Sequence, residues 1–212
     1  MASASRKPAW GRRRLALAVA ALALGGGCTS FAPVQPAPHV YTGRFSASIS
    51  REERREAVSG RFTLASSPGR TTLDLASPLG NTLARLEAVG SRATLTAPQA
   101  DGTLATWQGE SPEALAESVL GYRLPVSGLA DWIAGRAAPG RPARVFPQAG
   151  PTQRIEQDGW VVEIDERFEE GGAPRRLSFD RDAGGPAAPS IRLRLVLDGS
   201  GATLGVSERS RP

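Results

Sequence analysis

The sequence is poor in the residues that most often carry catalytic chemistry, because its 212 residues include one histidine and one cysteine. The lone Cys28 excludes an internal disulfide. The lone His39 excludes the Ser-His-Asp, Cys-His and zinc-ligand sets that need several such side chains. The carboxylates of Glu163 and Asp165 fall on a predicted strand, where charges on an outward face are usually solvated. The sequence therefore predicts no enzyme, no metal site and no cofactor.

The sequence also lacks a long hydrophobic run, since the apolar stretch Leu15–Leu24 has only ten residues. A membrane-spanning helix needs about 20 consecutive apolar residues. A basic stretch that contains Arg6, Lys7 and Arg12 precedes this run. A basic region followed by a short apolar region is typical of a secretory signal, so residues 1–27 are predicted to be a signal peptide that is removed.

Cys28 follows directly on three glycines, and this arrangement resembles a lipobox, the sequence at which signal peptidase II cleaves. Gly25 stands where a lipobox usually has leucine. The resemblance implies that Cys28 carries an N-acyl group and an S-diacylglycerol group, such as palmitate chains. The alternative is an ordinary secretory signal with an incidental cysteine. Thr29, rather than an aspartate, follows Cys28 and favours the periplasmic face of the outer membrane.

No charge imbalance remains once the signal is set aside. The whole chain has 26 basic and 21 acidic residues, but five of the basic residues and none of the acidic ones lie before Cys28. The remaining chain is formally neutral, which argues against a nucleic-acid partner.

The chain after Cys28 has the length of one domain. Residues 28–39 are rich in proline and predict an extended tether. Residues 40–198 are expected to form the folded domain. Residues 199–212 contain few apolar side chains and are expected to form a flexible tail.

Alternating apolar and polar residues predict a series of strands in the folded domain. One face of each strand is apolar, with the inward sets Phe45/Ala47/Ile49, Phe62/Leu64, Leu73/Leu75, Ala84/Leu86/Ala88, Ala93/Leu95, Trp160/Val162/Ile164, Leu177/Phe179 and Leu193/Leu195/Leu197. Short turns between neighbouring strands, such as Asp158-Gly159, require antiparallel pairing. The pattern predicts a sheet of about ten strands that is apolar on one face and either curls on itself or is covered by helices.

Two short helices are predicted in the middle of the chain. Ser111 can cap the first, Pro112 fits its first position, and Gly121 ends it. The second begins near Pro125 or Val126 and ends at Gly135.

Several motifs of the folded domain are specific enough to compare with a known family. The segment Leu120–Arg136 fits the pattern LG-x-x-[LI]-P-[LV]-x-x-L-x-x-W-[IL]-x-G, and Ser77–Thr82 contains a PLG loop; both resemble the LolB family of outer-membrane lipoprotein receptors. Further matches follow in the family's order at Gln157–Val162, Pro174–Leu177 and Ile191–Leu195. Together the motifs cover most of residues 40–198.

The resemblance implies a mostly β fold, an unclosed antiparallel β-barrel of about ten to eleven strands capped by two or three short helices, with an apolar cavity. Its candidate lining residues are Phe45, Phe62, Leu64, Leu75, Trp132, Ile133 and Trp160. Periodicity alone instead favours a fully packed core at these positions.

The resemblance further implies that Pro78, Leu79 and Gly80 form a protruding loop that assists insertion into the bilayer. The alternative is a leucine folded back as a small hydrophobic plug. By this resemblance the chain is a monomer that receives acylated lipoproteins from the periplasmic carrier LolA and inserts them among outer-membrane phospholipids. The competing hypothesis is a structural or interaction lipoprotein of similar fold without cargo transfer.

Overall fold

A computed structural model describes residues 37–51, 54–121, 123–147, 152–169, 172–182, 189–199 and 201–203. The predicted signal peptide (residues 1–27) and most of the predicted tether, including Cys28, lie outside the described residues. The described elements all belong to one unit of the chain, Pro36–Pro212. In chain order they are β1 (His39–Arg51), β2 (Arg54–Ser67), β3 (Arg70–Ala76), β4 (Thr82–Val89), β5 (Arg92–Pro98), β6 (Leu104–Gly109), α1 (Pro112–Leu120), α2 (Val126–Ile133), β7 (Ala143–Pro147), β8 (Gln153–Gln157), β9 (Trp160–Arg167), β10 (Pro174–Arg181), β11 (Ser190–Leu197) and β12 (Ala202–Thr203).

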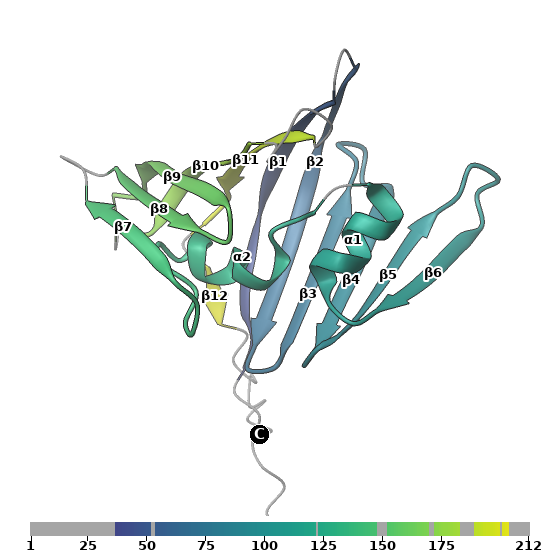
Figure 1. The fold of residues 1–212 in the computed structure, drawn as a ribbon, viewed down its shortest axis with the longest axis horizontal. Helices are drawn as coiled ribbons and strands as arrows, with labels where there is room; N and C mark the ends of the chain where they lie inside the picture. Colours follow the sequence, from purple (N-terminus) through teal and green to yellow (C-terminus); the bar gives the residue numbers. More distant parts are fainter. Residues whose placement is uncertain are drawn as a thin grey trace, which may run out of the picture. The chain divides into compact units, whose positions relative to one another are not determined.

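The strands form one antiparallel sheet in the order β6-β5-β4-β3-β2-β1-β11-β10-β9-β8-β7. Sequence neighbours pair as hairpins on both sides, and β1 pairs with β11 to join the two halves. In the described part of the chain β6 and β7 are the two edges and do not pair with each other, so the sheet stays open (Figure 1). The predicted fold class, an unclosed antiparallel barrel with two short helices, is confirmed.

Both helices lie on the same face of the sheet (Figure 1). The side chain of Ser111 accepts a hydrogen bond from the backbone N–H of Ala114 at 3.1 Å, which caps α1 as predicted. Gly121, with φ of 79°, ends α1 in the left-handed conformation that glycine adopts without strain. Helix α1 contacts β4, β5 and β6, whereas α2 buries Leu129, Trp132 and Ile133 in the main core.

The predicted strand faces are the buried ones. Inward residues of β1, β2, β9, β10 and β11 pack with α2 in one cluster, and residues of β4 and β5 pack with α1 in a second cluster. Burying one such side chain contributes on the order of 1.5–3 kcal/mol. The free energy gained by burying these inward side chains against α1 and α2 thus holds the helices on the sheet.

The end of the domain differs from its prediction. The flexible tail was expected from residue 199, but Ala202–Thr203 forms β12 and pairs with Val40 and His39 of β1. β1 begins at His39, within the expected tether. Its pairing with β11 starts only at Gly43, so the residues before Gly43 extend beyond that pairing. Backbone pairing needs no apolar side chains, so the composition of the tail gave no sign of this strand. Residues 204–212 lie outside the described part.

Candidate functional site

An apolar cavity of about 180 Å³, called here the inner cavity, lies between the helix-covered face of the sheet and α2. Every residue that lines it has an apolar side chain or, for Trp160, a mostly apolar one. The lining comprises Phe45, Ala47, Ile49, Val58, Phe62, Leu73, Leu75, Leu83, Ala84, Leu124, Pro125, Val126, Leu129, Trp160, Ile191, Leu193 and Leu195. A cavity without polar partners for water stays dry and favours an apolar ligand.

Strand register produces this lining. Phe45, Ala47 and Ile49 of β1 stand opposite inward residues of β11, and Ala47 also stands opposite Val58 of β2. Small side chains beside large ones leave space that a uniform row of leucines would fill. Alternation places these side chains on the inner face of the sheet, and the small volume of some of them leaves the cavity.

Two strand glycines make room for the aromatic rings that border the inner cavity. Gly60 stands opposite Phe45, and a Cβ at Gly60 would come within 3.0 Å of the Phe45 ring and closer still to the Ala76 carbonyl oxygen. Gly43 stands opposite Phe62, and a Cβ there would come within 2.8 Å of the Phe62 ring. Sequence reasoning missed both glycines, whose signal is an isolated glycine inside an alternating strand.

The structure divides the seven candidate lining residues into two groups. Phe45, Phe62, Leu75 and Trp160 line the inner cavity. Leu64, Trp132 and Ile133 do not line it, because each lies at most 1% exposed in the packed core beside it. At these three positions the structure has ordinary core packing, which is the alternative that periodicity alone favours.

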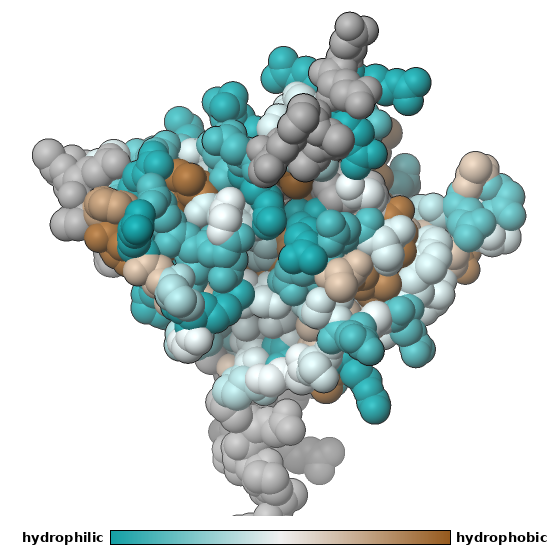
Figure 2. All heavy atoms as spheres, in the orientation of Figure 1, coloured by the Kyte–Doolittle hydropathy of each residue, from teal (hydrophilic) through white to brown (hydrophobic). Residues whose placement is uncertain are grey.

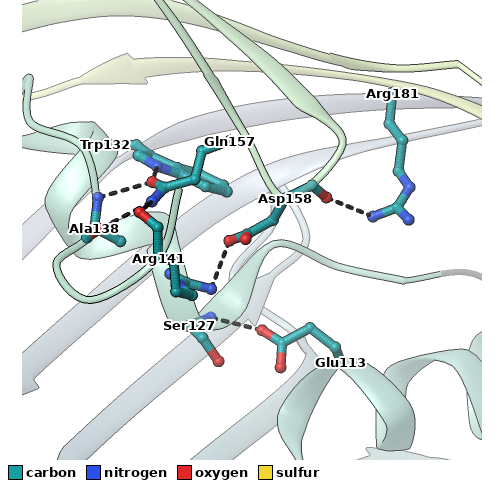
Figure 3. Close-up of polar contacts among 8 residues, drawn as sticks. All are labelled: Glu113, Ser127, Trp132, Ala138, Arg141, Gln157, Asp158 and Arg181. Atoms are coloured by element: carbon teal, nitrogen blue, oxygen red, sulfur yellow. Dashed lines mark hydrogen bonds and ion pairs between the residues drawn. The ribbon is translucent and has the colours of Figure 1, made fainter. Parts of the chain in front are cut away.

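Trp132 is held in that core by Gln157, a buried polar residue that sequence reasoning missed (Figure 3). The Trp132 indole N–H donates to the Gln157 Oε1 at 2.7 Å, and the same oxygen accepts from the Ala138 N–H at 2.8 Å. The Gln157 Nε2 donates in turn to the carbonyl oxygens of Ala138 and Arg141. One amide thus ties β8, α2 and the loop that follows α2 to each other.

Two further hydrogen bonds attach the helices at the side of the inner cavity. The Glu113 carboxylate of α1 accepts the backbone N–H of Ser127 in α2 at 2.8 Å (Figure 3). The Arg51 guanidinium, at the end of β1, donates to the carbonyl of Gly121 at 2.7 Å. These contacts link the β1–β2 hairpin, α1 and α2.

The loop between β3 and β4 exposes an apolar side chain. Ser77 and Asn81 close the loop, because the Ser77 N–H donates to the Asn81 carbonyl at 2.7 Å and the Ser77 hydroxyl accepts from the Asn81 N–H. Gly80 has a φ of 88°. Leu79 is 90% exposed, and Pro78 and Gly80 are exposed beside it. The leucine therefore points into solvent and is not a folded-back plug.

Over the helices the surface is largely hydrophilic, and hydrophobic atoms gather at the β7 edge, where Val145 and Phe146 are exposed (Figure 2). Within the described residues no helix is long and apolar enough to cross a bilayer. The same part of the chain contains no group of three or more His, Cys, Asp or Glu side chains placed to hold a metal ion.

The fold and its cavity define a class, the open antiparallel half-barrel that encloses an apolar cavity beneath helices. A family model described as "Outer membrane lipoprotein LolB" matches residues 40–199. The outer-membrane lipoprotein LolB of Cupriavidus metallidurans is 38% identical over 202 residues, which cover 88% of this chain and 96% of that protein. The LolB protein of Bordetella petrii is 40% identical over 171 residues, which cover 77% and 83%. The chain belongs to the LolB family of outer-membrane lipoproteins.

Proposed function

We propose that this chain localises lipoproteins to the outer membrane, receiving acylated lipoproteins from the periplasmic carrier LolA and inserting them into the bilayer. The observation that carries the proposal is the almost entirely apolar lining of the inner cavity. Each CH₂ group left in water costs about 0.8 kcal/mol, so an acylated cargo has to pass between apolar sites to cross an aqueous compartment. The chain would act as a monomer anchored through Cys28.

The inner cavity is too small to hold the whole acyl chains of a lipoprotein. At about 180 Å³ it is comparable to an engineered cavity of about 150 Å³ that binds benzene, so it fits only a short piece of an acyl chain. Uptake of whole chains requires the cavity to widen. Widening would have to displace α2, which borders the inner cavity through Val126 and Leu129 and has no ladder hydrogen bonds to the sheet.

The exposed loop supplies the second step, in which cargo leaves for the membrane. Leu79 is available to enter the apolar edge of a bilayer without any rearrangement, because it is already 90% exposed. Phospholipid is thus the expected partner of residues 78–80, and acyl chains are the expected partner of the inner cavity.

The variant Leu79→Glu tests the proposal, because it separates uptake of cargo from delivery. We expect the free energy of unfolding to change by less than about 0.5 kcal/mol, since the side chain is exposed. The variant should accept lipoprotein from the carrier at the wild-type rate and release it slowly, because a charged tip enters hydrocarbon at high cost. A two-stage assay follows labelled lipoprotein from carrier to receptor and then into liposomes.

Leu104→Glu is the matched control, because Leu104 is also an exposed leucine, 68% accessible, but lies on the edge strand β6. It should leave both stages unchanged. Delivery into liposomes by Leu79→Glu at the rate of Leu104→Glu would remove the insertion role from this loop.

A further inference from the structure

A second hollow, of about 280 Å³, adjoins the inner cavity and differs from it in chemistry. We call it the polar pocket. Arg123, Arg141 and Arg181 line it together with the carboxylates of Glu113 and Asp158. Pro125 and Trp160 line both hollows, so the two hollows adjoin at these side chains. The arrangement places hydrogen-bond donors directly beside an apolar site.

The carboxylates of the polar pocket already have partners within the protein. Glu113 accepts the Ser127 N–H, and the Asp158 carboxylate pairs with the Arg141 guanidinium. Figure 3 shows the Asp158 carboxylate turned toward Arg141 and its backbone carbonyl toward Arg181. Both carboxylates are thus engaged by donors of the protein itself.

The guanidinium groups keep donors to spare, and Arg181 keeps the most. Arg123 pairs with Glu117 at 2.6 Å, and Arg141 pairs with Asp158. The only protein acceptor within hydrogen-bond range of Arg181 in the described structure is the Asp158 carbonyl, at 3.4 Å, although a guanidinium has five N–H donors. Arg181 also stands over the Trp160 ring, 5.7 Å from its centroid, and Trp160 lines the inner cavity as well.

An acyl chain of a lipoprotein ends in an ester or amide carbonyl, which only accepts hydrogen bonds. Burying that carbonyl without a donor costs free energy, and the lining of the inner cavity offers almost none. Charged donors are available in the polar pocket, which shares Trp160 and Pro125 with the inner cavity. A ligand that joins apolar chains to ester carbonyls matches the two hollows together.

We propose that the polar pocket is the subsite for the acyl-linked glyceryl-cysteine of the cargo, with Arg181 donating to its ester carbonyls while the chains enter the inner cavity. The inference rests on the proposed function, because it presumes that acyl chains occupy the inner cavity. It adds a means of distinguishing an acylated cysteine from a bare hydrocarbon.

A comparison of ester and ether ligands tests this directly. The probes are a cysteinyl peptide with an N-hexanoyl group and an S-glyceryl group bearing either two hexanoyl esters or two hexyl ethers. Binding to the full chain in lipid nanodiscs is measured by calorimetry. We expect wild type to prefer the ester by about five- to tenfold, and Arg181→Gln to lose that preference while binding the ether as before.

Arg175→Gln is the matched control, because Arg175 also lies on β10 with its guanidinium over an aromatic ring, 5.9 Å from the centroid of Phe168. It should keep the ester preference. Arg181→Lys retains the charge and should keep part of the preference, which covers the case in which Arg181→Gln folds poorly.

Four results would overturn the inference. Equal binding of ester and ether by wild type, or an equal loss of both in Arg181→Gln, would leave the proposed function intact and reject the subsite. Failure of both peptides to bind wild type would reject the proposed function as well. Dihexanoyl phosphatidylglycerol and its diether give the last comparison. If only this lipid, and not the peptide, shows an ester preference that Arg181→Gln removes, the pocket binds membrane lipid instead of cargo.

Discussion

At the scale of single residues, Gln157 determines how α2 is fixed to the sheet. It is 3% exposed, and its amide serves Trp132, Ala138 and the carbonyl of Arg141. No side-chain nitrogen or oxygen buried in the described residues is left without a partner, and Gln157 also supplies the partner of the buried Trp132 indole. An apolar side chain at position 157 would leave buried donors and acceptors in the core without hydrogen-bond partners.

Gln157→Leu should therefore lower the free energy of unfolding by about 2–4 kcal/mol, because each buried group left unpaired costs about 1–3 kcal/mol. Urea denaturation measures the change. Gln108→Leu on β6 is the control, since Gln108 is exposed and should shift stability by less than about 0.5 kcal/mol. If the two variants lose equal stability, the hydrogen bonds of Gln157 contribute nothing beyond a surface amide.

The residues of the site were predictable from the sequence only where a local pattern marks them. Pro78 and Gly80 favour an exposed turn around Leu79, but the sequence alone slightly favours a leucine folded back as a plug; the family resemblance implies the protruding loop, and the structure exposes Leu79. Leu64 and Phe62 share one inward face of β2, yet only Phe62 lines the inner cavity. Alternation gives the face of a residue, but the space beside it depends on side chains from other strands.

At the scale of elements, α2 depends on a glycine that helix propensity disfavours. A Cβ at Gly128 would come within 2.6 Å of the Trp132 ring, which lies over the helix one turn further on. The Trp132 ring cannot shift freely away from the helix, because its indole N–H is hydrogen-bonded to Gln157 and its ring centroid lies 6.3 Å from that of Phe179. The glycine thus allows the helix to carry a buried tryptophan at this position.

We expect Gly128→Ala to destabilise the fold by about 1–2 kcal/mol. Overpacking costs about 1–3 kcal/mol, and the better helix propensity of alanine returns at most about 1 kcal/mol. Thermal melting gives the loss, and near-ultraviolet circular dichroism reports the displaced tryptophan. The exposed neighbour Ser127→Ala should change neither signal. A more stable Gly128→Ala would mean that propensity outweighs the contact with Trp132.

Elements with strong local signals were predicted well. Ser111, Pro112 and Gly121 mark the ends of α1, and Asp158-Gly159 marks a two-residue hairpin in which both residues have positive φ, 54° and 76°. Strands β6, β7 and β8 had no clear alternating set in the sequence. β6 and β7 are edge strands, and exposed side chains on both faces, such as Val145 and Phe146, blur the period of two.

At the scale of the whole molecule, we expect the lipid anchor and the folded domain to have separate tasks. Cys28 lies outside the described residues, and the inner cavity is built entirely from residues 45–195. We therefore expect Cys28→Ala to lose labelling by an alkyne fatty acid in cells and to accept cargo from the carrier in vitro at the wild-type rate. Equal labelling of both proteins would remove Cys28 as the anchor, and a well-folded variant that refuses cargo would give the anchor a part in binding.

The most direct test of the central claim, that acyl chains bind in the inner cavity, is to fill the cavity and measure cargo uptake. Ala84 lines it from β4, and Ala84→Phe adds a ring to a space of about 180 Å³ without introducing a polar group. Ala57→Phe is the control, because Ala57 is exposed on β2 next to the lining residue Val58. The measurement is the rate at which labelled lipoprotein passes from the carrier to each protein. We expect Ala84→Phe to fold and to accept cargo at least about tenfold more slowly than Ala57→Phe, a difference of about 1.4 kcal/mol. Uptake by the filled variant at the control rate would show that the chains bind elsewhere.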